Sequence, residues 1–165
     1  MTVQIEFDHD VQDVFEALTD PEFLVKRNLA LGELSAQCDV KKGQKQTTIT
    51  MVREVRRVLP GVLAKMFDPV NVMDMTEIWR PVGQGWSGNW DLDIQDQPVS
   101  ISGSFELLPT ARGCRYSVTH LAKVEIPFLR GQIEKFILGQ TTSGADNELT
   151  YLGNYLDQDQ DQDRD

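Results

Sequence analysis

Cysteine and histidine are scarce in this sequence, and the common phosphate-binding patterns are absent. The chain has two cysteines, Cys38 and Cys114, and two histidines, His9 and His120. None of the four lies at the spacing of zinc ligands, so we predict no metal site and two buried thiols rather than a disulfide. Because there is no Gly-rich phosphate loop, dinucleotide fingerprint or serine nucleophile elbow, we expect no cofactor.

Basic residues and long apolar runs are also lacking. The chain carries 16 Lys and Arg against 26 Asp and Glu, a formal net charge of −10. This balance argues against nucleic acid or an anionic membrane surface as the main partner. Without a secretory signal or an apolar run long enough for a membrane span, we expect a cytoplasmic protein. Residues 157–165 are almost all Asp and Gln and predict a disordered acidic tail.

The apolar content is sufficient for one hydrophobic core. With 165 residues, 40% of them hydrophobic, the chain predicts a single domain over residues 1–156. Residues 2–8 alternate between apolar and polar, as a half-buried strand does. Asp10 and then Asp20, with Pro21 behind it, stand at N-cap positions and predict two short helices that end near Gly32.

The middle of the sequence has the periodicity of a sheet. From Glu33 to about Ile126 the apolar period stays near two and is interrupted by turn residues, which predicts six further strands in hairpin succession. Residues 62–67 are too continuously apolar for an exposed turn and predict a short helix or a lid. After Pro127 the apolar spacing becomes helical, and a helix to about Leu156 would be roughly 45 Å long.

Three short motifs punctuate the succession of a strand, two short helices, six antiparallel strands and a long final helix: Asp-Pro-Glu-Phe at 20–23, Leu-Pro-Gly at 59–61 and Val-Glu-Ile-Pro at 124–127. With these motifs the succession resembles the SRPBCC superfamily, which includes START, polyketide-cyclase and pollen-allergen proteins. It covers about residues 2–156. Trp-Arg-Pro at 79–81 and the stretch at 126–131 are most similar to a bacterial branch of unknown function.

The resemblance implies an α+β helix-grip fold, a seven-stranded curved antiparallel sheet around a long C-terminal helix. It also implies a cavity between sheet and helix, where superfamily members bind lipids, hormones, aromatic polyketides or hydrophobic cofactors, and where some catalyse cyclisation or dehydration. Fold alone does not choose among these activities.

The strand alternation, taken literally, assigns an inward face that is rich in Met and Trp. Thioethers and flat aromatic rings suit a pocket for an irregular apolar ligand, although the same residues can fill an ordinary core. On the helix, the apolar stripe becomes small and polar near Gln140, Gly144 and Ala145, which predicts room for a ligand there. The candidate ligand-binding residues are Met51, Met73, Met75, Trp79, Trp86, Trp90, Phe105, Tyr116, His120, Ile133, Phe136 and Gln140.

Five ionisable residues lie on the predicted inward face, Arg53, Arg57, Glu77, Tyr116 and His120, and all of them except Arg57 are candidates for catalysis. A buried ionisable group must be paired or have a function. Arg53 and Glu77 on neighbouring strands could form an internal ion pair, and His120 could be a satisfied core residue. Alternatively, His120 or Glu77 transfers a proton while Arg53 or Tyr116 binds a carbonyl or an enolate.

Three functions therefore remain open. The first is binding or transport of a hydrophobic small molecule, lipid-like or aromatic, by a monomer or homodimer. The second is a cyclase or dehydratase acting on an aromatic or polyketide-like substrate. The third is a protein-interaction module. The lack of a recognisable catalytic set favours the first.

Overall fold

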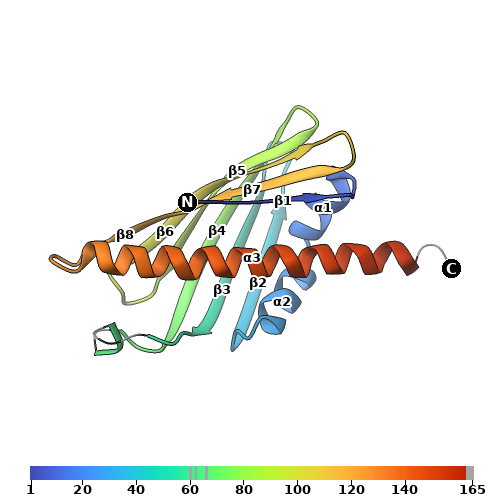
Figure 1. Ribbon diagram of the computed structural model, residues 1–165. Helices are drawn as coiled ribbons and strands as arrows, with labels where there is room; N and C mark the ends of the chain where they lie inside the picture. Colours follow the sequence, from blue (N-terminus) through green and yellow to red (C-terminus); the bar gives the residue numbers. More distant parts are fainter. Residues whose placement is uncertain (60, 62, 66, 163–165) are drawn as a thin grey trace.

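The computed structural model describes residues 1–59, 61, 63–65 and 67–162. A curved antiparallel sheet grips one long helix that crosses its concave side (Figure 1). The strands are β1 (Thr2–Phe7), β2 (Ser35–Lys42), β3 (Thr47–Arg56), β4 (Val70–Val82), β5 (Gly85–Ile94), β6 (Val99–Pro109), β7 (Cys114–Thr119) and β8 (Leu121–Val124). The helices are α1 (Val11–Leu18), α2 (Pro21–Ala30), the single 3₁₀ turn η1 (Leu63–Lys65) and α3 (Arg130–Gln162). The predicted α+β helix-grip architecture is confirmed.

The sheet follows hairpin order from β2 to β6, and β1 closes it at the far edge. The strand order is β1-β7-β6-β5-β4-β3-β2, with β8 pairing β6 beyond the end of β7. Every pairing is antiparallel. Because successive side chains of a strand point to opposite faces of the sheet, every second side chain lies on the concave face that α3 crosses. The last predicted strand is in fact two strands, because regular pairing is interrupted at His120 between β7 and β8.

The two short helices begin where the sequence predicts. The side chain of Asp10 accepts a hydrogen bond from the backbone N–H of Gln12, and that of Asp20 accepts one from Glu22. Each cap satisfies a backbone donor that the first helical turn leaves unpaired. Helices α1 and α2 follow β1 directly in the chain and cover one end of the sheet (Figure 1).

The long helix begins and ends later than expected. It starts at Arg130 rather than Pro127, after Phe128 adopts a left-handed backbone conformation with φ of 67°. It continues to Gln162, so residues 157–162 are helical and the prediction of a disordered tail is wrong for them. Residues 163–165 lie outside the described residues. Of residues 62–67, for which we predicted a short helix or a lid, the structure describes only η1 and Phe67, because residues 62 and 66 also lie outside the described residues.

Aromatic rings pack directly over two glycines on the inward face of the sheet. A Cβ at Gly88 would lie 2.6 Å from the ring of Phe105, and a Cβ at Gly103 would lie 2.6 Å from Nε1 of Trp90. These aromatic residues are the direct cross-strand partners of the two glycines. The aromatic rings therefore occupy the space that the missing side chains of the two glycines would otherwise leave to a ligand.

Both cysteines are free thiols, as predicted. Cys114 is fully buried in the core and Cys38 is half-buried on β2. Burial raises the pKa of each thiol to about 11, so both remain protonated and unreactive at neutral pH.

Candidate functional site

A pocket of about 210 Å³ lies between the inward faces of β3 to β7 and helix α3. Its helical wall consists of residues that recur every three or four positions along α3, so one face of the helix lines the pocket. These residues are Ile133, Phe136, Ile137, Gln140, Thr141, Gly144, Ala145, Glu148 and Leu149. The pocket therefore lies where the stripe on the final helix changes from apolar to small and polar.

The sheet wall of the pocket is mostly apolar. Met73 and Met75 of β4 lie beside Leu92 of β5, and the rings of Trp90 and Phe105 complete the centre of the wall. At one end, Leu59, Leu63 and Phe67 extend this wall beneath the start of α3. Aliphatic, thioether and aromatic side chains thus surround most of the space, as in many small-molecule sites.

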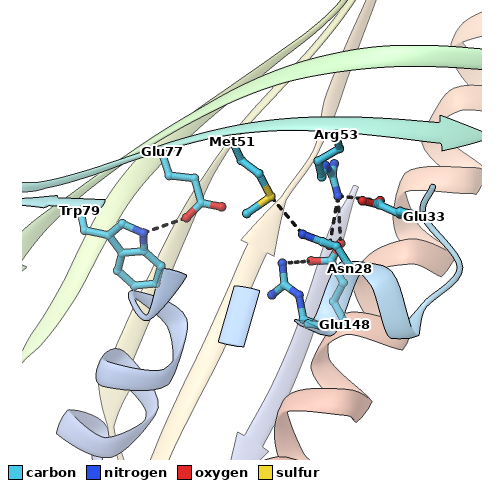
Figure 2. Close-up of polar contacts among 8 residues, drawn as sticks. Asn28, Glu33, Met51, Arg53, Glu77, Trp79 and Glu148 are labelled. Carbon is cyan, nitrogen blue, oxygen red and sulfur yellow. Dashed lines mark hydrogen bonds and ion pairs between the residues drawn. The ribbon is translucent and has the colours of Figure 1, made fainter. Parts of the chain in front are cut away.

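At the α2 end of the pocket, two arginines share one glutamate of α3. Arg27 donates from Nη2 to Oε2 of Glu148 at 3.0 Å, and Nη1 of Arg53 lies 3.7 Å from Oε1 of the same side chain. Arg53 also pairs with Glu33 at 3.0 Å (Figure 2). Burial raises the pKa of Glu33, and the Arg53 guanidinium partly opposes this effect. The Nε atoms of Arg27 and Arg53 are buried without a hydrogen-bond acceptor among the described residues.

Glu77 faces the pocket without an ion pair to any described residue. Its Oε2 accepts a hydrogen bond from Nε1 of Trp79 at 2.9 Å, as Figure 2 shows. Burial raises the pKa of Glu77 above its usual value, while this hydrogen bond lowers it in part. A carboxyl group in this setting takes up a proton more readily than an exposed one.

Arg57 also lines the pocket and has no ion pair within the described chain. Its only side-chain hydrogen bond there is a long one, from Nη1 to the carbonyl oxygen of Arg56 at 3.4 Å. The backbone N–H of Arg57 donates to Pro69 at 2.8 Å, which fixes the residue just beyond the end of β3. Burial lowers the pKa of Arg57, an effect that Glu33 partly reverses.

Tyr116 and His120 line the pocket from the β7 side of the sheet. Burial raises the pKa of Tyr116 well above its usual value, with a further contribution from Glu77, so its phenol stays neutral. Burial lowers the pKa of His120, which favours the uncharged imidazole. The His120 ring meets Trp90 edge-on at 5.5 Å, and its Nδ1 is buried without a partner in the described part of the chain.

All four candidate catalytic residues line this one pocket, and Arg53 and Glu77 do not form the internal ion pair that was one of the two alternatives. Arg53 is paired across the strands with Met73, whereas Glu77 lies opposite Ile49. The offset separates the two side chains, and Arg53 instead contacts the carboxylates of Glu33 and Glu148. Both side chains face inward as the strand alternation predicts, whereas alternation along a strand does not determine the register between two strands.

Nine of the twelve candidate ligand-binding residues line the pocket, and Met51, Trp79 and Trp86 do not. Met51 is buried, and its sulfur accepts a hydrogen bond from Nδ2 of Asn28 at 3.0 Å. Trp86 stacks on Phe15 with ring centroids 4.0 Å apart. The Trp79 indole is 1% exposed and packs between Phe15 and Phe105. These three residues belong to the core that supports the pocket under α1.

Arg27 and Glu148 also line the pocket but were not predicted, because strand alternation identifies inward-facing polar residues only on strands and both residues lie on helices. Glu148 lies four residues after Gly144 and three after Ala145, the positions at which the helical stripe became small and polar. Extending that stripe by one turn would have identified it. Arg27 lies on α2, next to the buried Asn28, and no periodicity in the sequence distinguishes it from an exposed helix residue.

Two further classes of site find no support in the described residues. No group of three or more His, Cys, Asp and Glu side chains there could hold a metal ion. None of the helices in the same residues is long and apolar enough to cross a membrane.

A curved antiparallel sheet gripping a helix, with a pocket between the two, is a helix-grip fold, and solved START-like and aromatase/cyclase structures share it, which confirms the predicted resemblance to SRPBCC proteins at the level of the fold. The chain belongs to the family described as "Protein of unknown function (DUF2505)", whose model matches residues 2–156. No curated protein matches the sequence.

Solved structures share this fold at low sequence identity. The Thermus thermophilus protein TTHA0849 is 15% identical, with a TM-score of 0.63 over 93% of this chain and 94% of that one. The Zhui aromatase/cyclase of Streptomyces sp. R1128 is 8% identical, with a TM-score of 0.62 over 94% and 91%. A START superfamily protein of Mycobacterium smegmatis is 12% identical, with a TM-score of 0.60 over 96% and 97%. At these identities the likeness concerns the fold alone.

Proposed function

We propose that this protein binds a hydrophobic small molecule, lipid-like or aromatic, in the pocket between the sheet and α3. The observation that carries the proposal is the composition of the pocket wall. Apolar side chains of the sheet, of α3 and of the η1 region surround a space that also contains a few fixed polar groups. Binding sites for small molecules have this composition, with an apolar body and a small number of groups that orient the ligand.

The size of the pocket limits the ligand. A volume of about 210 Å³ is smaller than the roughly 300–1,000 Å³ typical of sites for drug-sized molecules. A short alkyl chain or a compact aromatic system therefore fits better than a long lipid. The fold and the START-like relatives support a ligand-binding domain of this kind.

Native mass spectrometry of protein purified under mild conditions, together with displacement of a fluorescent fatty acid or a naphthalene dye, tests the proposal. The sharpest variant is Gly144→Leu, because Gly144 lines the pocket and a Cβ there meets no atom within 4 Å. The new side chain fills the pocket without a backbone clash and should abolish dye binding. Replacement of glycine also improves helix propensity.

Gly139→Leu is the matched control on the same helix. Gly139 has equally open surroundings but does not line the pocket. We expect it to leave dye affinity unchanged. If wild type binds neither dye and carries no small molecule, or if the two leucine variants behave alike, the pocket is not the binding site.

A second candidate function is dehydration or cyclisation within the same pocket. It is favoured by Glu77 and Tyr116, which both line the pocket and both adjoin the Trp79 indole, one by a hydrogen bond and one by a ring contact at 6.0 Å. A carboxyl group whose pKa is raised by burial gives up and takes up a proton at higher pH than an exposed one, and a neutral phenol can donate to a carbonyl oxygen. Incubation with a β-hydroxy ketone, followed by absorbance of the unsaturated product, tests it. Activity that is lost in Glu77→Gln supports an enzyme, and absence of product in wild type rules this candidate out.

A further inference from the structure

The positive charges of the pocket are not all balanced by carboxylates. Arg27, Arg53 and Arg57 line it, together with the carboxyl groups of Glu77 and Glu148. Glu148 contacts both Arg27 and Arg53, at 3.0 and 3.7 Å. Glu33 also pairs with Arg53, at 3.0 Å, and acts on Arg57 only from beyond ion-pair distance, as Glu148 does. No carboxylate of the described residues contacts Arg57, so its guanidinium is the cation of the pocket that lacks an ion-pair partner there.

The guanidinium of Arg57 also has unused hydrogen-bonding capacity. It carries five N–H donors in a planar arrangement that matches a carboxylate, and it remains charged at all physiological pH values. Only one long hydrogen bond, to the Arg56 carbonyl, is formed within the described chain. An arginine held in a half-buried position with most donors unused is suited to bidentate binding of an anion.

The other acidic group of the pocket does not compensate this charge. Glu77 is held by the Trp79 indole and lies on β4, opposite Ile49 of β3, whereas Arg57 lies beyond the end of β3. Burial raises the pKa of Glu77 and so disfavours its charged form. The carboxylate of a ligand could therefore bind Arg57 without disrupting the ion pairs that Arg27 and Arg53 already form with Glu148 and Glu33.

The surroundings of Arg57 explain how one molecule can satisfy both the cation and the apolar wall. Leu59, Leu63 and Phe67 line the same pocket next to it along the chain, and Met73 of β4 lies one strand away. An anionic group at Arg57 therefore places the rest of a ligand against aliphatic, aromatic and thioether side chains.

We propose that the ligand of this pocket is a small amphipathic acid, whose carboxylate binds Arg57 and whose alkyl or aromatic body packs on the wall formed by Met73, Met75 and Leu92. This inference rests on the proposed function and adds the charge of the ligand and the residue that selects it. Neutral lipids and neutral aromatic molecules of the same size bind more weakly, because they leave the Arg57 guanidinium desolvated and unpaired.

Isothermal titration calorimetry with two matched pairs of probes tests the inference: naphthoate against naphthamide, and decanoate against decanamide. We expect wild type to bind at least one acid about tenfold more tightly than its amide, the lower end of what a charge-assisted hydrogen bond contributes, because the site is half-exposed. Arg57→Gln should weaken the acid by about the same factor and leave the amide nearly unchanged. Arg57→Lys should retain part of the preference, since it keeps the charge but not the planar pair of donors.

Arg56→Gln is the matched control, since it removes the same charge one residue away, on the exposed face of β3. Arg56→Gln should change neither the affinity for the acids nor the affinity for the amides. Amides that bind as tightly as the acids, or an acid affinity that Arg57→Gln leaves unchanged, would overturn the inference while the pocket still binds apolar molecules. If neither the acids nor the amides bind to wild type, both this inference and the proposed function are wrong.

Discussion

Arg27 of α2 and Glu148 of α3 form an ion pair, 3.0 Å from Nη2 to Oε2, at the end of the pocket. The Arg27 side chain is 7% exposed and that of Glu148 is 30% exposed. Because the second oxygen of Glu148 also faces Arg53 of β3, a single carboxylate connects two helices and the sheet. The same contacts that join these elements thus form a wall of the pocket.

Glu148→Gln should destabilise the protein, since it leaves two buried guanidinium groups with one fewer anion. Removing one partner of a fully buried pair costs roughly 3–5 kcal/mol, and the partial exposure of Glu148 reduces the expected cost to about 2 kcal/mol. Urea unfolding measures it. Glu134→Gln is the control, because Glu134 pairs with the exposed Arg130 one turn away on α3 and should cost less than about 0.5 kcal/mol. Equal effects of the two substitutions would contradict the role assigned to Glu148.

Glu77 should make the stability of the protein depend on pH. Burial raises its pKa in the folded state, so the folded protein retains a proton at pH values where the unfolded chain has lost it. Stability therefore falls as pH rises from the unfolded pKa, about 4.3, through the folded one. Glu77→Gln keeps an acceptor for Trp79 but does not ionise. The free energy of unfolding of Glu77→Gln should therefore increase relative to that of wild type as the pH rises, because only wild type loses this stability.

Unfolding of both proteins in urea across the acidic to neutral range measures this difference. Glu106→Gln, on the exposed face of β6, controls for the general effect of net charge. A difference between Glu77→Gln and wild type that does not change with pH would show that Glu77 titrates alike in the folded and unfolded chains.

The fold could be predicted from the sequence because its periodicities are local. Alternation along β3 assigns Ile49, Met51, Arg53 and Val55 to the inward face, and all four are buried. The same reasoning could not determine how β3 and β4 align. Register depends on the hairpin between two strands, here a long connection through η1, and so the relation of Arg53 to Glu77 was not accessible.

The site was predicted less completely than the fold, because packing decides which inward residues reach open space. Strand alternation assigns Trp79, Trp86 and Trp90 to the inward face of the sheet. However, Phe15 of α1 covers the first two, whereas Trp90 lines the pocket. Where α1 would lie against the sheet is a tertiary question that strand periodicity does not address. The contact between Arg27 and Glu148 was beyond prediction for the same reason.

Gly103→Ala should disrupt the centre of the sheet. A Cβ at this position would lie 1.9 Å from the carbonyl oxygen of Thr119, which also accepts the 3.2 Å hydrogen bond from Nε1 of Trp90. Backbone cannot retreat as a flexible side chain can, so we expect a loss of about 3 kcal/mol in stability, at the upper end of overpacking effects. Gly139→Ala on α3, where a Cβ meets nothing within 4 Å, should instead stabilise by about 0.5–1 kcal/mol. Thermal unfolding of both variants tests this; a Gly103→Ala protein as stable as wild type would contradict the close packing of Trp90 over Gly103.

The structural part of the final helix should end at Leu156, although the helix continues to Gln162. Leu152 and Leu156 are 0% and 5% exposed in the main core, whereas the Asp157 side chain is exposed and contacts His9 through one hydrogen bond at 2.8 Å. Deleting residues 157–165 removes this exposed side chain and its single contact, and should therefore change the free energy of unfolding by less than about 1 kcal/mol. Ending the chain after Tyr155 removes Leu156 as well and should cost about 3 kcal/mol, as the loss of a buried leucine does. Urea unfolding of the two truncated chains separates these cases: a large loss from the shorter deletion would mean that the acidic segment contributes to the fold, whereas equal stabilities would mean that Leu156 does not.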